Sequence, residues 1–133
     1  MRFEIVRWEQ LSDDDRKWLE PMPGVDKPNF REMQQKLVDG EWWIFRLPWP
    51  AQGLAVGFPD EGRLFIYYLR GYQLFSTVTS EDLLAAARAV NLHGMRAETR
   101  KLGVLKLLLN KGFRLTKITD GPIYGVELDN VRR

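Results

Sequence analysis

Residues 64–99 read LFIYYLRGYQLFSTVTSEDLLAAARAVNLHGMRAET, and the patterns in this stretch decide the fold. Residues 64–69 are nearly all apolar, which is typical of a central strand that is covered on both faces. Residues 79–80 can cap a helix with an apolar face, and Gly94 ends that helix. Residues 95–99 then predict a short strand. A strand, a helix and a strand at this spacing form a crossover unit, so the two strands are predicted to be parallel neighbours.

The N-terminal half predicts a strand, two helices and an antiparallel meander. Apolar and charged residues alternate over residues 3–8, which favours a half-buried strand. Ser12 can cap a first short helix, and Asn29 can cap a second one with Glu32 three residues later. Apolar runs separated by proline- and glycine-containing turns predict three strands at residues 42–47, 54–58 and 64–69.

The C-terminal part adds one helix and two strands. The helix is predicted over residues 102–111 and ends at Gly112. Strands are expected over residues 113–118 and 123–128, on either side of a turn that contains a proline. The fold class is therefore α/β (α+β) with a mixed sheet in the order β-α-α-β-β-β-α-β-α-β-β. No repeat or linker interrupts it, so residues 1–133 are predicted to form a single domain.

The composition is that of a folded protein, because 44% of the 133 residues are hydrophobic and 29% are charged. No apolar run is long enough to cross a bilayer, so no membrane partner is expected. The chain has no cysteine, which excludes disulfides, thiolate nucleophiles and cysteine metal sites, and no metal site is expected. We therefore expect a cytoplasmic protein.

The charges of both signs are mixed along the chain, with 20 basic and 18 acidic residues and a net charge of +2. A dedicated nucleic-acid-binding protein usually carries a clustered basic stripe, so this class is disfavoured. Arg96, Arg100 and Lys101 could form a small basic patch that attracts a phosphate or an acidic partner, or they could simply be a solvated face.

The predicted element order resembles that of the GNAT superfamily of N-acetyltransferases over essentially the whole chain. The most specific local match lies in residues 94–99, which look like the fifth strand of that family, and in residues 108–113, which look like its last helix and the Gly-Phe junction. Glu98-x-Arg100, followed by a short helix and Gly112-Phe113, is similar to a pattern in small GNAT-like proteins encoded by phages. That resemblance implies a location in the host cytoplasm or the virion.

The resemblance also implies acetyl-CoA as a cofactor, with its pyrophosphate on the N-terminus of the crossover helix. Unpaired backbone N–H groups and the positive end of the helix dipole make such a terminus an anion site. The cofactor-binding residues that the resemblance implies are Leu69, Arg70, Gly71, Gln73, Ser76, Thr77 and Val78.

This sequence departs from the pyrophosphate motif of the family, Arg/Gln-x-x-Gly-x-Gly/Ala. Gln73 fits the first position, but Ser76 and Val78 stand where glycine or alanine is expected. A β-branched side chain poorly suits a tight loop around phosphate. Glu81 and Asp82 follow directly, which suits a helix start but repels a pyrophosphate.

Two further positions differ from the family. Leu108 replaces a tyrosine that protonates the departing thiolate, and Lys101 stands in place of an asparagine that helps to hold the cofactor. The first hypothesis is therefore a GNAT-fold protein with a degenerate acetyl-CoA site and no cofactor, which binds another protein or itself, as a phage-type or virion-associated component. The alternative is an active N-acetyltransferase with an atypical pyrophosphate loop. A third option is a binder of a small ligand or nucleotide in the same cleft.

Few side chains offer chemistry for acetyl transfer. Glu98 is the candidate general base, acting through water, and the competing interpretation is an ion-pair partner of Arg96 or Arg100. Aromatic residues suggest a groove or a protein contact beside the parallel strands. The groove residues predicted on this basis are Trp43, Tyr67, Tyr68 and Arg100.

Overall fold

The computed structural model describes residues 3–19, 29–47, 52–72 and 78–129. The strands are β1 (Glu4–Val6), β2 (Trp43–Arg46), β3 (Gln52–Asp60), β4 (Arg63–Tyr72), β5 (Gly94–Thr99), β6 (Arg114–Thr119) and β7 (Ile123–Asp129). The helices are the 3-10 turn η1 (Trp8–Gln10), α1 (Asp13–Lys17), α2 (Phe30–Val38), α4 (Ser80–Ala89) and α5 (Leu102–Asn110). Within these ranges, no helix is long and apolar enough to span a bilayer.

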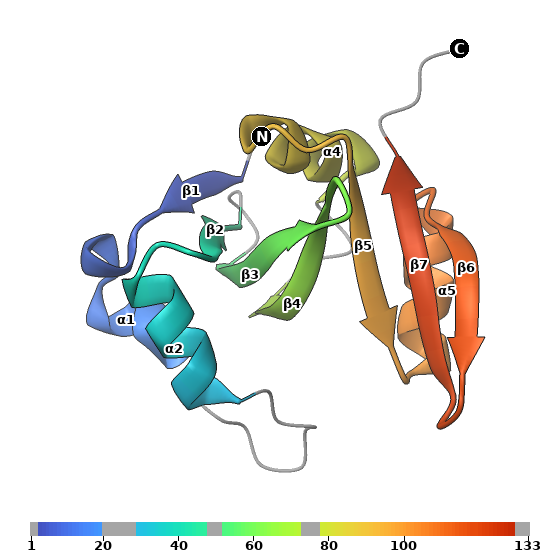
Figure 1. Cartoon of the computed structure of the whole chain (residues 1–133), viewed down its shortest axis with the longest axis horizontal. Coiled ribbons are helices and arrows are strands. Elements are labelled where there is room, and N and C mark those ends of the chain that lie inside the picture. Colours follow the sequence, from blue (N-terminus) through green and yellow to red (C-terminus); the bar gives the residue numbers. More distant parts are fainter. Residues whose placement is uncertain (1–2, 20–28, 48–51, 73–77, 130–133) are drawn as a thin grey trace.

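The strands form a seven-stranded mixed sheet in the order β1-β2-β3-β4-β5-β7-β6 (Figure 1). β4 and β5 are parallel neighbours joined by α4, and the other neighbouring strands are antiparallel. The predicted fold class and the central parallel pair are thus confirmed. β3 and β4 are longer than predicted, because the strands continue through the facing pair Gly53 and Gly71.

The helix caps follow from short polar side chains at the helix starts. The Ser12 and Thr79 hydroxyl groups accept hydrogen bonds from the backbone N–H groups of Asp15 and Asp82, respectively, each at 3.1 Å. Asn29 accepts one from Glu32 at 3.0 Å, which confirms the predicted start of α2. Each such bond satisfies a backbone donor that the helix itself leaves unpaired.

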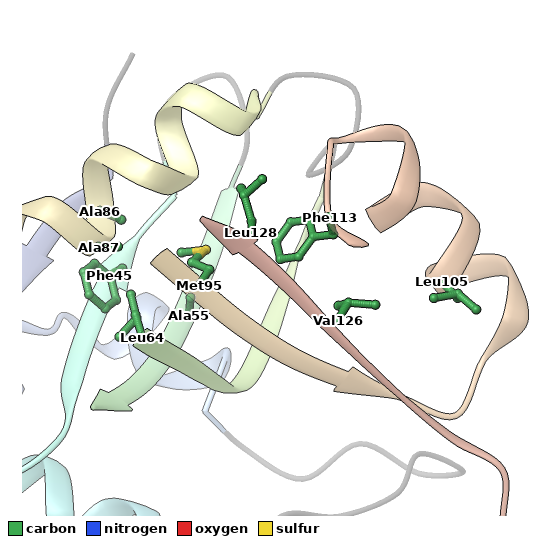
Figure 2. Packing of buried hydrophobic residues seen from close by; sticks show 10 residues of the cluster. All are labelled: Phe45, Ala55, Leu64, Ala86, Ala87, Met95, Leu105, Phe113, Val126 and Leu128. Atoms are coloured by element: carbon green, nitrogen blue, oxygen red, sulfur yellow. The ribbon is translucent and has the colours of Figure 1, made fainter. Parts of the chain in front are cut away.

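Two apolar cores lie on opposite faces of the sheet. On β2, Phe45 belongs to the core under α4 and α5, whereas the adjacent Ile44 belongs to the core under α2. Figure 2 shows the first of these cores, in which Leu64, Met95 and Val126 come from the central strands. The near-continuous apolar sequence of the central strands is therefore explained by burial on both sides.

A β-bulge at Tyr67 interrupts the β3–β4 pairing. Val56 pairs with Tyr68 and Gly57 pairs with Ile66, so that Tyr67 is an extra residue on β4. A bulge bends its strand and increases the local twist. On the other edge of β4, pairing with β5 is confined to residues 63–65. The two parallel strands therefore touch at one end and separate beyond it.

An ion-pair network crosses the joined end of these strands, on the sheet face opposite α4 and α5. Arg63 Nε donates to Asp129 Oδ1 at 2.7 Å, and Arg96 Nη1 donates to Asp60 Oδ2 at 2.7 Å. Buried Glu127 lies between the arginines, with its oxygens 3.4 Å from Arg63 Nη2 and 3.1 Å from Arg96 Nη2. The network links β3, β4, β5 and β7 where the cleft begins.

The pKa of Asp129 gives a test of this network. Hydrogen bonding from Arg63 lowers the pKa of this carboxyl from 3.8 to about 2, against the opposing effect of burial. A lowered pKa means that the stabilisation is fully present above about pH 4 and is lost as the pH falls through about 2. We expect Asp129→Asn to lower the free energy of unfolding by about 1–2 kcal/mol at pH 7.

Chemical denaturation of both proteins across this pH range measures the difference. It should shrink below pH 4, be mostly lost near pH 2, where about half of Asp129 is protonated in the folded wild type, and disappear as the pH falls further. Glu9→Gln, at an exposed carboxylate outside the network, is the control and should change stability by less than about 0.5 kcal/mol. A pH-independent loss in Asp129→Asn would contradict the ionic origin.

Candidate active-site cleft

A cleft of about 690 Å³ opens where β4 and β5 separate. Its walls come from β4, β5, α5 and the start of α4, and these elements surround the space beyond the three paired residues. A volume of this size is that of an ordinary small-molecule site. The wall residues that carry the following description are Tyr67, Tyr68, Leu69, Gly71, Val78, Glu98, Arg100, Lys101, Val104, Leu108 and Lys111.

The β4 wall is a strand edge. Beyond Phe65, no residue of β4 pairs with β5 within the described part of the chain. The peptide groups on that side, as far as Gly71, therefore face the cleft, whereas those on the other side are bonded to β3. Exposed strand edges bind extended ligands through main-chain hydrogen bonds.

The opposite wall is basic. Arg100, Lys101 and Lys111 line it, and Glu98 is the single acidic residue among the described lining residues. The backbone N–H of Lys101 donates to Thr99 Oγ1 at 3.1 Å, which fixes the turn from β5 into α5. Three cations against one anion around a concave space favour an anionic ligand.

One side of α5 forms most of this wall. Lys101, Val104, Leu108 and Lys111 follow one another at intervals of three or four residues and all line the cleft. Such spacing places side chains on one face of a helix. Val104 and Lys111 were not among the predicted site residues, although this spacing in the sequence was a readable signal for both.

Glu98 lies in the cleft wall and forms an ion pair with Lys117 of β6, with 3.3 Å between Oε2 and Nζ. The alternative prediction was an ion pair with Arg96 or Arg100, and its Arg96 part is wrong. Arg96 is directed to Asp60 and Glu127, because the ion-pair network holds its guanidinium at the joined end of the strands.

The residues predicted to bind a cofactor separate into three groups. Leu69, Gly71 and Val78 line the cleft. The Arg70 side chain points away from the cleft. Its Nη1 donates to the Lys17 carbonyl at 3.0 Å, and its guanidinium lies over the Trp18 ring. Neighbouring side chains of a strand point to opposite faces, which explains the difference. The remaining three, Gln73, Ser76 and Thr77, lie outside the described residues.

Three of the four predicted groove residues line the cleft, namely Tyr67, Tyr68 and Arg100. Trp43 does not, because it packs against the core under α4 and α5. Trp42 is the tryptophan near the groove, since its ring lies 4.8 Å from the ring of Tyr67. The Tyr67 hydroxyl accepts a hydrogen bond from the Asn29 backbone N–H at 3.2 Å, which ties the bulge to the start of α2.

The start of α4 is closed by a capping box. The Thr79 backbone N–H donates to Asp82 Oδ2, and the Asp82 N–H donates to Thr79 Oγ1, each at 3.1 Å. Two backbone donors are thus bonded within the helix, and the Asp82 carboxylate adds negative charge at its positive end. Val78, directly before it, is 2% exposed.

Within the described ranges, no group of three histidine, aspartate or glutamate residues could hold a metal ion.

The sequence matches no protein-family model and no curated protein. Solved structures do match. An acetyltransferase of Bacillus subtilis, determined in complex with CoA, has a TM-score of 0.63 and 15% identity, covering 98% of this chain and 100% of its own. The ribosomal-protein-S18-alanine N-acetyltransferase of Escherichia coli has a TM-score of 0.66 and 12% identity, covering 98% and 96%.

A protein of Desulfovibrio desulfuricans assigned to the GNAT family has a TM-score of 0.66 and 16% identity, with 97% of this chain and 98% of its own covered. Likenesses that span nearly the whole length of both chains show that this chain has the GNAT fold. The closer resemblance to phage-encoded members remains a prediction. Fold alone does not define an activity, which must be inferred from the cleft.

Proposed function

We propose that the chain binds a CoA thioester in the β4–β5 cleft and transfers the acyl group to an amine. The observation that carries this proposal is the pairing of two unlike walls, a strand edge on β4 and the cations Arg100, Lys101 and Lys111 on the other side. The CoA complex of the Bacillus subtilis structure supports it by analogy of fold.

The two walls match the two parts of CoA. The pantetheine arm is extended and carries two amides, which can bond to the free edge of a strand as another strand would. The phosphate groups carry several negative charges, and a charge-assisted bond to lysine or arginine is about twice as strong as a neutral one. Lys101 and Lys111 at the two ends of α5 can supply such bonds.

The proposed reaction needs two proton movements. The amine attacks the thioester carbonyl, a C–N bond forms, the C–S bond breaks, the amine loses a proton and the thiolate gains one. Glu98 is proposed to accept the amine proton through water. A backbone N–H near the Tyr67 bulge is proposed to polarise the carbonyl oxygen. Leu108 cannot supply a proton, so the thiolate is proposed to take one from water.

A second candidate is a protein with a degenerate acetyl-CoA site that binds a partner without catalysis. Two observations favour it: the capping box of Thr79 and Asp82 places a carboxylate where pyrophosphate would bind, and the aliphatic Leu108 lines the cleft. Binding and turnover therefore have to be measured separately.

The binding step is tested with CoA and the wild-type chain. CoA at about one hundred times its dissociation constant stabilises the folded state by about 2.7 kcal/mol, which should raise the melting temperature by several degrees. Lys101→Glu should weaken binding at least tenfold in calorimetric titration, because it reverses a charge in the wall. Absence of any shift at saturating CoA would refute the proposal.

Lys106→Glu is the matched control, since Lys106 is an exposed α5 residue outside the cleft lining. Its affinity for CoA should stay within about threefold of the wild type. Binding through phosphates should also weaken with added salt. Equal losses in the two variants would show that the cleft wall does not select the ligand.

The chemical step is tested by the release of free thiol from acetyl-CoA with a panel of amino acids, polyamines and peptide N-termini. Glu98→Gln should lower kcat about 10²-fold or more, as expected for loss of a general base, with CoA affinity retained. Lys117→Met removes the ion-pair partner but keeps the carboxylate, and should retain most activity. CoA binding without thiol release from any amine would favour the second candidate.

A further inference from the structure

A small apolar recess lies beside the cleft, between α4 and the sheet. Its volume is about 30 Å³, and every described residue that lines it is apolar. Figure 2 shows four of these residues where α4 packs on the strands, namely Phe45, Ala55, Ala86 and Met95. Cavities with purely apolar walls stay dry. The recess can therefore take an apolar group without displacing bound water.

The recess and the cleft share part of their walls. The residues that line both spaces are Ile66, Leu69, Leu83 and Met95. Ile66 comes directly before the Tyr67 bulge, where the thioester carbonyl is proposed to be bound. Ile66 packs against the core under α4 and α5, whereas Tyr67 packs against the core under α2. An acyl chain that starts at the bulge can therefore extend beside Ile66 towards α4.

Two small side chains keep the recess open. Ala55 on β3 and Ala86 on α4 both line it, and both are buried. Protein interiors contain few voids larger than a water molecule, and a larger apolar side chain at either position would fill this one. The empty space costs the surrounding residues packing contacts, which an apolar ligand group would restore.

We infer that the recess binds the end of an acyl chain longer than acetyl, so that the preferred substrate is a short-chain acyl-CoA such as butyryl-CoA. This inference rests on the proposed function of the cleft. A space of about 10–15 Å³ holds one water-sized group, so the recess of about 30 Å³ holds about two methylene or methyl groups. The acetyl part of the chain lies in the cleft, and the whole acyl group then has about four carbons.

Calorimetric titration with CoA thioesters, without an amine, tests the inference. Each methylene that enters an apolar site should tighten binding about fourfold, so butyryl-CoA should bind about 15-fold more tightly than acetyl-CoA. Octanoyl-CoA should bind no more tightly than butyryl-CoA, because the recess is then full. Equal affinities for acetyl-CoA and butyryl-CoA, or a gain that continues to octanoyl-CoA, would overturn the inference alone. Failure of CoA and of every thioester to bind would overturn the proposed function as well.

A matched pair of variants on α4 tests whether the chain lies in the recess. Ala86→Val fills part of the recess and should lower the preference for butyryl-CoA over acetyl-CoA from about 15-fold to about threefold or less. Ala89→Val makes the same change at an exposed residue of the same helix and should keep the preference within about twofold of the wild type. The same preference in both variants would overturn the inference.

Leu83→Ala tests the same site in the opposite direction and keeps the inference testable if Ala86→Val does not fold. Leu83 lines both the recess and the cleft, so its truncation enlarges the space for the chain. The affinity for hexanoyl-CoA relative to butyryl-CoA should rise at least about threefold over the wild-type ratio. A folded Leu83→Ala variant with the wild-type ratio would contradict a chain bound in the recess.

Discussion

The cleft depends on the short parallel pairing between β4 and β5, which ends after three residue pairs. Within the described residues, β4 and β5 are bonded only through residues 63–65 and 94–96, and ion pairs from Arg63 and Arg96 to the shared carboxylate of Glu127 connect them there. Beyond that point the bulge at Tyr67 bends β4 away while α4 and α5 cover one face. The cleft is the space between the separated strands. It exists because β4 is paired with β5 at one end and is bent by the bulge at Tyr67 beyond that pairing.

The cleft combines features that favour and oppose the binding of a phosphate-rich molecule. A free strand edge and three cations favour it, and they come from elements that are far apart in the sequence. The carboxylate of Asp82 at the start of α4 opposes it. The cations flank α5, whereas Asp82 belongs to α4 and is not among the described lining residues, so attraction and repulsion come from different elements.

Much of the fold was predictable because local signals agree with one another. The apolar run of residues 64–69, the caps at Thr79 and Asn29, and the crossover spacing all indicate one topology. The residues that line the cleft were harder to predict. Side chains of a regular strand alternate between its two faces, and this alternation is interrupted at the Tyr67 bulge. Ile66 and Leu69, three residues apart, both line the cleft, and nothing in the sequence marks Tyr67 as extra.

Ion pairs between residues far apart in the sequence could not be predicted either. Glu98 meets Lys117 because β7 and β6 fold back beside β5, a contact that no spacing within residues 94–99 reveals. Trp43 and Trp42 could not be assigned to faces without the register. Three residue pairs join β4 to β5, and this short pairing affects how the two strands can move. If β5 rotates slightly relative to β4 about these three residue pairs, the unpaired ends of the two strands move apart by a larger distance, because they lie farther from the point of rotation.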